Sequence, residues 1–319
     1  MSRRTKVFFR VAVLVAVGLF LYIRIAAHQS TLAAWGGWHA ALEKADVRLW
    51  TAMLLLAALN WGIEAAKWRL LMTEVQPMGR LRAFSATLAG TAIGMFTPNR
   101  TGEFVGRVLF LAPENRWRGG FASVLGSIAQ FAITVIAGGT AFVLWLPQRA
   151  VSDGGHWPSL AMAAVVSLVA IATLIFYFQP RLLQQVVAKL PLIRRLGKEA
   201  AVLDKFPLRI SAMVLALSGL RYAIFMAQYM VLLTLVAVVP LATSLLAVPL
   251  IFLTTTLVPT MLLTELGVRG SVAVVLLVPA LQDPSPVLLA ALMLWAVNLA
   301  LPAVVGGFIL LSQRIRGPV

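Results

Sequence analysis

Two polar segments interrupt an otherwise apolar sequence, and both combine residue types that bind charged groups. The first, residues 97–103, reads Thr-Pro-Asn-Arg-Thr-Gly-Glu, and the second, residues 264–270, reads Thr-Glu-Leu-Gly-Val-Arg-Gly. Each provides a glutamate and an arginine four residues apart, a spacing that brings opposite charges together on a helix: Glu103 with Arg107, and Glu265 with Arg269. The guanidinium fork matches the geometry of phosphate. The pattern therefore predicts a binding site for an anionic group.

We expect the substrate-binding side chains to come from these segments and from one arginine in a later apolar run. The predicted set is Thr97, Asn99, Arg100, Glu103, Arg107, Arg221, Glu265 and Arg269. Two alternatives stay open: the Glu–Arg pairs could be purely structural salt bridges, and Arg221 could either line the site or pair with Glu64. Three threonines are predicted N-caps of half-helices whose positive ends face the middle of the protein: Thr97, Thr101 and Thr264.

The sequence gives no sign of catalytic or metal chemistry. Cysteine is absent, and His28, His39 and His156 lack ligand spacing. We therefore expect no metal, no cofactor and no catalytic residue, and we interpret the chain as a non-enzyme. Glycines of the polar segments would let a helix or a lipid head group approach closely, or would serve tight packing alone: Gly102, Gly106, Gly267 and Gly270.

Composition identifies lipid as the surroundings of most of the chain. Of 319 residues, 61% are hydrophobic and 12% are charged, far from the balance of soluble domains. The net charge of +16 comes from basic residues scattered through short loops, which argues against nucleic-acid binding. A membrane-spanning helix needs about 20 residues. Six apolar runs are candidate spans: Val11 to Ile23, Leu49 to Ile63, Gly119 to Leu146, Trp157 to Phe178, Ile210 to Val239 and Pro286 to Leu311.

The polar segments divide two further apolar runs into arms that are too short to cross a bilayer. In residues 84–111, an apolar arm of thirteen residues precedes the polar tip and an arm of eight follows it. At about 1.5 Å per residue the longer arm extends roughly 20 Å, about two-thirds of the hydrocarbon core. We therefore predict two re-entrant hairpins, over residues 84–111 and 246–281, each entering and leaving on one side.

The distribution of charge then predicts the topology. With six spans and two re-entrant hairpins, most of the 27 lysines and arginines fall on one side, which the positive-inside rule assigns to the cytoplasm together with both termini. The prediction is an all-α polytopic membrane protein in two halves, residues 1–152 and 153–319. Each half has three spans and one hairpin, so the second is an inverted repeat of the first. Interrupted segments at equivalent positions of such halves mark a transporter's binding site.

Together, the two polar segments resemble the paired motifs of the transmembrane flippase region of lysylphosphatidylglycerol synthases and its stand-alone relatives. The matching positions are Pro98, Arg100, Gly102 and Glu103 in the first motif and Leu266, Gly267, Val268 and Arg269 in the second. The resemblance covers nearly the whole chain. It implies a bacterial inner-membrane protein that moves, or helps to move, a phospholipid or other lipid-linked head group between leaflets. Relatives often have a second glycine before Leu-Gly-Val-Arg, where this chain has Glu265.

The leading hypothesis is a flippase-like transporter of an anionic or zwitterionic lipid, with membrane phospholipid as its partner and no synthase domain in this chain. Protein partners left open are a second copy of the chain and a lipid-synthesising enzyme on a separate chain. One alternative is a polyprenyl-phosphate-dependent glycosyltransferase, which needs paired external carboxylates. The predicted external acids are not paired: Glu43, Asp46, Asp153 and Asp283. The other alternative is a small-solute carrier, which the same inverted architecture suits.

Overall fold

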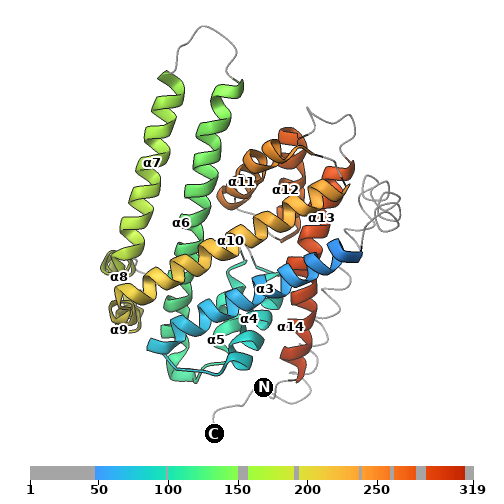
Figure 1. The fold of residues 1–319 in the computed structure, drawn as a ribbon. Helices are drawn as coiled ribbons and strands as arrows, with labels where there is room; N and C mark the ends of the chain where they lie inside the picture. Colours follow the sequence, from blue (N-terminus) through green and yellow to red (C-terminus); the bar gives the residue numbers. More distant parts are fainter. Residues whose placement is uncertain are drawn as a thin grey trace.

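The fold is helical throughout the part of the chain that can be described (Figure 1). The computed structural model describes residues 47–97, 100–149, 157–189, 194–236, 239–258, 262–277 and 285–312. Within these ranges the chain forms helices and turns and no β-strand, which confirms the predicted all-α class there. The predicted first span, Val11 to Ile23, and both chain termini lie outside the described residues.

Five helical segments are long and apolar enough to cross a membrane, and they correspond to five of the six predicted spans. The first four are formed by α3 (Val47–Leu71), α6 (Arg116–Arg149), α7 (Trp157–Phe178) and α10 (Leu208–Val236). The fifth joins α13 (Ser285–Trp295), a π-helical turn (Ala296–Ala300) and α14 (Leu301–Ser312). A multipass membrane protein follows from these five segments.

The predicted end of the second span was wrong. The sequence placed it at Ile63 and put Lys67 in a cytoplasmic loop, but α3 continues to Leu71 and a 3-10 turn follows at Met72–Glu74. Lys67 is 2% exposed, and its Nζ forms an ion pair with Glu64 Oε2 at 2.8 Å. Two opposite charges at i and i+3 neutralise each other inside the bundle, so they extend the helix instead of ending it.

The first polar segment forms the tip of a helical hairpin, as predicted. Its arms are α4 (Arg80–Gly94) and α5 (Gly102–Val108), which pack against each other. A Cβ atom on Gly106 would lie 2.6 Å from the Cα atom of Gly90, and one on Gly102 would lie 2.7 Å from the carbonyl oxygen of Ile93. These two glycines therefore serve close helix approach. Entry of the hairpin into the bilayer stays a prediction.

The predicted N-cap of α5 was wrong in one detail. Thr101 precedes the helix but makes no side-chain capping bond. Instead, the backbone N–H of Gly102 donates to Thr97 Oγ1 over 2.6 Å, so the hydroxyl at the start of the tip satisfies the first free N–H of the helix.

The second hairpin consists of α11 (Leu241–Leu257) and α12 (Leu262–Leu277), and its turn lies earlier than predicted. The segment expected to break the chain, residues 264–270, lies inside α12, so Thr264 is not an N-cap. Val258 has extended backbone angles, φ −82° and ψ 118°. The residue before a proline avoids the helical region, and Pro259 follows it. Two glycines within a helix cost about 1 kcal/mol each, too little to end it.

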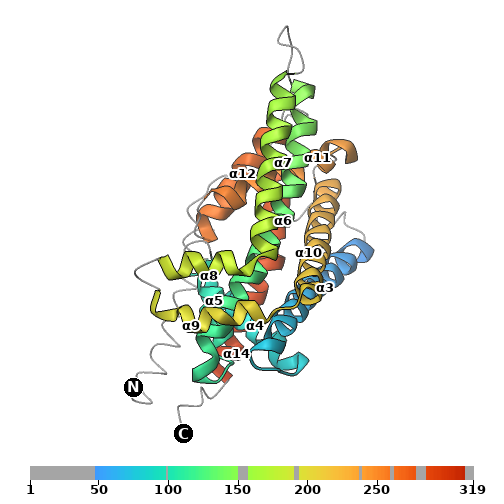
Figure 2. The ribbon, with the colours of Figure 1, turned by 90° about the vertical axis from the view of Figure 1, so that its left-hand side faces the viewer.

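Helices that are far apart in the sequence pack against one another across the molecule. Helix α3 packs along α10, and the two cross the molecule side by side in Figure 1. Helix α4 of the first hairpin packs against α14, near the C-terminus, whereas α11 of the second hairpin packs against α6. A glycine lies at each of these contacts: Gly306 of α14 faces Leu88, and Gly138 of α6 faces Leu253. The hairpins lie toward opposite ends of the molecule (Figures 1 and 2).

Helices α6 and α7 form a long antiparallel pair that extends beyond the rest of the bundle (Figure 1). Much of the surface of α7 is apolar and exposed, as expected of a helix that faces lipid. The basic segment after α7 is also helical, with α8 (Pro180–Lys189), a 3-10 turn (Arg194–Leu196), α9 (Gly197–Ala200) and a second 3-10 turn (Ala201–Lys205). Figure 2 shows α8 and α9 running across the direction of α6 and α7.

We expect Gly106→Ala to destabilise the first hairpin, because the added methyl group meets the backbone of Gly90. Overpacking of this kind costs about 1 to 3 kcal/mol. The matched control is Gly62→Ala in α3, where a Cβ meets nothing within 4 Å and a helical alanine is favoured over glycine. Thermal unfolding of the purified protein checks both. Equal unfolding temperatures for the two variants would contradict the close approach of α4 and α5.

Candidate functional site

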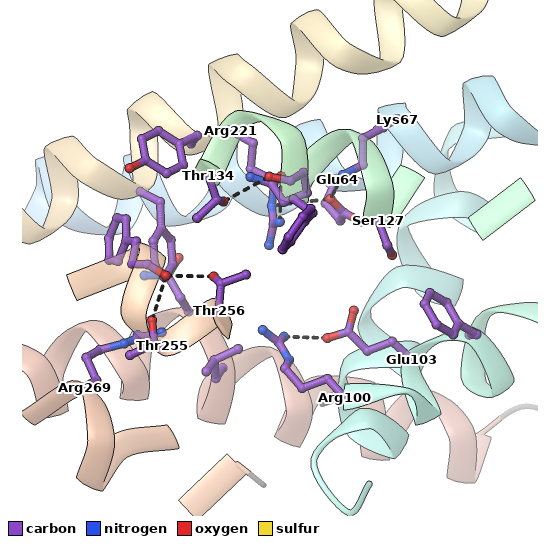
Figure 3. A pocket seen from close by; sticks show the side chains of 18 of the residues that line it. Glu64, Lys67, Arg100, Glu103, Ser127, Thr134, Arg221, Thr255, Thr256 and Arg269 are labelled. Carbon is purple, nitrogen blue, oxygen red and sulfur yellow. Dashed lines mark hydrogen bonds and ion pairs between the residues drawn. The ribbon is translucent and has the colours of Figure 1, made fainter. Parts of the chain in front are cut away.

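A polar pocket of about 440 Å³ lies between the two hairpins and is shown in Figure 3. Its walls come from α3, α5, α6, α10, α11, α12 and the π-helical turn, so residues from both parts of the chain meet there. Polar and charged lining residues are Glu64, Lys67, Arg100, Glu103, Arg107, Ser127, Gln130, Thr134, Arg221, Tyr222, Thr255, Thr256, Arg269 and Asn298. Apolar lining residues are Phe104, Phe131, Phe225, Phe252 and Leu299.

Glu64 is the centre of the charge network on one wall. Its Oε2 forms ion pairs with Lys67 Nζ at 2.8 Å and with Arg221 Nε at 3.4 Å, while its Oε1 accepts a hydrogen bond from Arg107 Nη1 at 2.8 Å. The carboxylate thus joins α3 to α5 and α10. Glu64 and Lys67 are both buried, at 7% and 2% exposure. A buried charge is stable only when it is paired and hydrogen-bonded, and here one carboxylate serves three cations.

Arg107 connects this network to the tip of the first hairpin. Its Nη2 donates to Glu103 Oε2 at 3.0 Å, so the same guanidinium bridges two carboxylates. Glu103 also pairs with Arg100. Exposure rises along this series, from 8% of the Arg107 side chain to 29% of Arg100. Arg107 therefore stabilises the network from within, whereas Arg100 presents its charge to the pocket.

Arg100 is held in an unusual backbone conformation. Its φ is 59°, in the left-handed region that non-glycine residues rarely adopt. The backbone N–H of Arg100 donates to the carbonyl oxygen of Thr97 over 3.1 Å, and the Thr97 hydroxyl accepts from Gly102. Such conformations cost of order 1 to 3 kcal/mol and concentrate at ligand-binding positions. In this strained conformation, the side chain of Arg100 points into the pocket.

Arg269 of the second hairpin approaches the same pocket through aromatic rings. Its guanidinium carbon lies 5.7 Å from the ring centroid of Phe225 and 5.9 Å from that of Phe252. Tyr229 stacks on Phe252 with ring centroids 6.0 Å apart. Arg269 is 5% exposed, and the rings stabilise its charge by cation–π attraction.

Two amide side chains complete the polar lining. Arg221 Nη1 donates to Gln130 Oε1 at 3.3 Å, which links α10 to α6. Asn298, in the π-helical turn, accepts from Asn60 Nδ2 at 2.8 Å and is 5% exposed. Single π turns inside α-helices occur frequently at functional sites.

The structure brings most of the predicted site residues together. Five of them line the pocket: Arg100, Glu103, Arg107, Arg221 and Arg269. Both options for Arg221 hold, since it faces Glu64 and also lines the pocket. Thr97 supports the tip from outside the lining. Asn99 lies outside the described residues, as does the side chain of Glu265. Substrate binding by this set stays a prediction.

The predicted site set omits nine polar residues of the lining: Glu64, Lys67, Ser127, Gln130, Thr134, Tyr222, Thr255, Thr256 and Asn298. Lys67 could have been found from its i, i+3 spacing to Glu64, which marks a paired charge within a helix. Gln130 and Asn298 are amides within apolar runs, and such amides often join helices, so their type alone did not distinguish them. Within the described ranges, no three His, Cys, Asp or Glu side chains lie close enough together to hold a metal ion.

The fold and the pocket define a multipass helical membrane protein with an arginine-rich polar pocket. The family described as the lysylphosphatidylglycerol synthase TM region matches residues 7–306 of the sequence. This match covers nearly the whole chain, and the chain belongs to that family, as the two motifs predicted. Comparisons with curated proteins and with solved structures found no match.

We expect Glu64→Gln to destabilise the protein strongly, because it leaves Lys67 buried without its carboxylate. Breaking a buried pair in this way costs roughly 3 to 5 kcal/mol. Lys67→Met should cost less, since Glu64 keeps Arg107 and Arg221. Thermal unfolding of both single variants and of the double variant checks this, with the double variant more stable than Glu64→Gln alone. A Glu64→Gln protein that unfolds at the wild-type temperature would contradict the network.

Proposed function

We propose that this protein moves a lipid with an anionic head group between the two leaflets of the bacterial inner membrane, holding the head group in the pocket. The observation that carries the proposal is the charge of the described lining. It holds five cationic side chains, Lys67, Arg100, Arg107, Arg221 and Arg269, and two carboxylates, Glu64 and Glu103. A lipid phosphate is the abundant anion that reaches such a pocket from within the membrane.

The energetics favour a phosphate ligand over an empty cationic pocket. An arginine at the centre of a bilayer costs about 2.5 to 3.5 kcal/mol on the lenient insertion scale, and residues of this kind mark substrate pathways. Two carboxylates offset only part of that cost here. A bound phosphate supplies the missing negative charge, and it suits the planar donor fork of arginine.

The pocket is also amphipathic, as a lipid head group requires. Phenylalanines line it beside the charges: Phe104, Phe131, Phe225 and Phe252. Their rings offer apolar surface to the glycerol and upper acyl carbons while the arginines hold the phosphate. Ligand pockets commonly combine such apolar walls with a few placed polar groups. A small inorganic ion has no apolar part that these rings could contact.

The interlocked helices support an alternating-access mechanism. Exchange of α4 and α11 between the two parts of the chain is the contact pattern that an inverted repeat produces. In the proposed mechanism the hairpins re-enter from opposite faces, both termini are cytoplasmic, and rocking of one half against the other exposes the pocket to each leaflet in turn. The protein then acts as a carrier and not as an enzyme, with no covalent change in the lipid.

Reconstitution into liposomes with a fluorescent phospholipid tests the function. We expect Arg100→Asn to lower the rate of lipid movement at least about tenfold, the effect of losing about 1.4 kcal/mol of binding in the transition state. Asparagine tolerates the left-handed backbone at this position, so the change removes charge with little strain. The matched control is Arg181→Asn in α8, whose side chain is 86% exposed and should leave the rate unchanged.

The experiment tests the transport function and the site assignment separately. A wild-type protein that moves no lipid faster than empty liposomes contradicts the transport function. A wild-type rate in Arg100→Asn, with transport intact, contradicts the assignment of the pocket as the head-group site.

A further inference from the structure

We infer that the pocket selects a lipid whose head group ends in a dianionic phosphate, a phosphomonoester, over phosphodiester and zwitterionic lipids. This inference rests on the proposed function and specifies its substrate class. It follows from how the described cations and carboxylates share their contacts and from the direction of two arginines.

The first observation is a charge surplus within one connected network. Four cations share two carboxylates: Lys67, Arg107 and Arg221 contact Glu64, while Arg107 and Arg100 contact Glu103. Two positive charges are therefore in excess among these six side chains. Uncompensated charge is expensive in a low-dielectric interior, so the network favours a ligand that brings two negative charges.

The second observation is the direction of the two most exposed cations. The guanidinium groups of Arg100 and Arg221 point toward the same space from opposite walls of the pocket (Figure 3). Their side chains are 29% and 25% exposed, the highest values in the network. Arg221 directs Nε toward Glu64 and Nη1 toward Gln130. Like charges that face each other favour an anion between them.

A phosphomonoester fits this arrangement better than the other common head groups. Its terminal phosphate has three oxygens available to donors from both walls and carries about −1.5 to −2 charge at pH 7. A phosphodiester carries one negative charge and has only two such oxygens, so it leaves part of the surplus uncompensated. A zwitterionic head group adds no net charge at all.

The carboxylates disfavour a head group that carries an amine. Glu64 already contacts three cations, and both oxygens of Glu103 are used by Arg100 and Arg107. An incoming ammonium would have to displace an arginine from one of these carboxylates. The acids in this pocket therefore stabilise the arginines instead of offering a second subsite for a cationic group.

Binding of soluble short-chain lipids to the purified full-length protein tests the inference. Dihexanoyl phosphatidic acid, phosphatidylglycerol and phosphatidylethanolamine are titrated separately, with glycerol 3-phosphate as the head group without acyl chains, and binding is followed by thermal unfolding. At pH 8 we expect phosphatidic acid to bind at least about tenfold more tightly than either other lipid. At pH 5, below the second phosphate pKa of about 6, its advantage over phosphatidylglycerol should fall below about threefold.

Substitutions at Arg221 assign this preference to the pocket. Arg221→Gln should abolish the preference at pH 8, Arg221→Lys should retain part of it, and the control Arg181→Gln should retain it fully. If Arg221→Gln does not fold, the Arg221→Lys variant and the pH dependence of the wild type still test whether the pocket prefers phosphatidic acid.

Three outcomes overturn the inference. Equal affinity for phosphatidic acid and phosphatidylglycerol at pH 8, with lipid movement intact in liposomes, contradicts dianion selection while the transport function stands. Glycerol 3-phosphate binding as tightly as phosphatidic acid makes the ligand a soluble phosphate and contradicts both proposals. Absence of binding by every lipid contradicts the proposed function itself.

Discussion

The pairing of Arg107 with two carboxylates is the interaction on which the rest of the site depends. One guanidinium contacts Glu64 of α3 and Glu103 of α5, and Glu64 in turn contacts Lys67 and Arg221. These contacts join a long helix, a short half-helix and a helix from the other part of the chain. Charge in a membrane-spanning bundle must be compensated locally, so the network fixes the relative positions of these elements.

The first hairpin positions Arg100 at the surface of the pocket. Glycines let the backbones of α4 and α5 approach closely. The Thr97 hydroxyl caps α5, and the left-handed backbone of Arg100 turns that side chain into the pocket. The second hairpin contributes Arg269 from a continuous helix, with the rings of Phe225 and Phe252 beside its guanidinium group. Both hairpins thus supply a positive charge to the same pocket.

The sequence predicted the features that arise from strong local patterns. Long apolar runs predicted five of the spans that the structure contains, and i, i+4 spacing predicted the pair of Glu103 with Arg107. The position of the second turn was not predicted correctly. It was expected at the glycines near Arg269, which lie inside α12, whereas α11 ends just before Pro259, which restricts the backbone of the residue before it. Lys67 and Asn298 enter the pocket only through tertiary packing, and hydropathy alone assigns one to a loop and the other to an ordinary span.

The most direct measurement of the central claim is an experimental structure of the protein in a lipid nanodisc that contains anionic phospholipid. The account predicts a phosphate between the guanidinium groups of Arg100 and Arg221, with Arg107 still bridging Glu64 and Glu103. A pocket without lipid phosphate, in a structure that resolves bound lipids elsewhere on the protein, would contradict it.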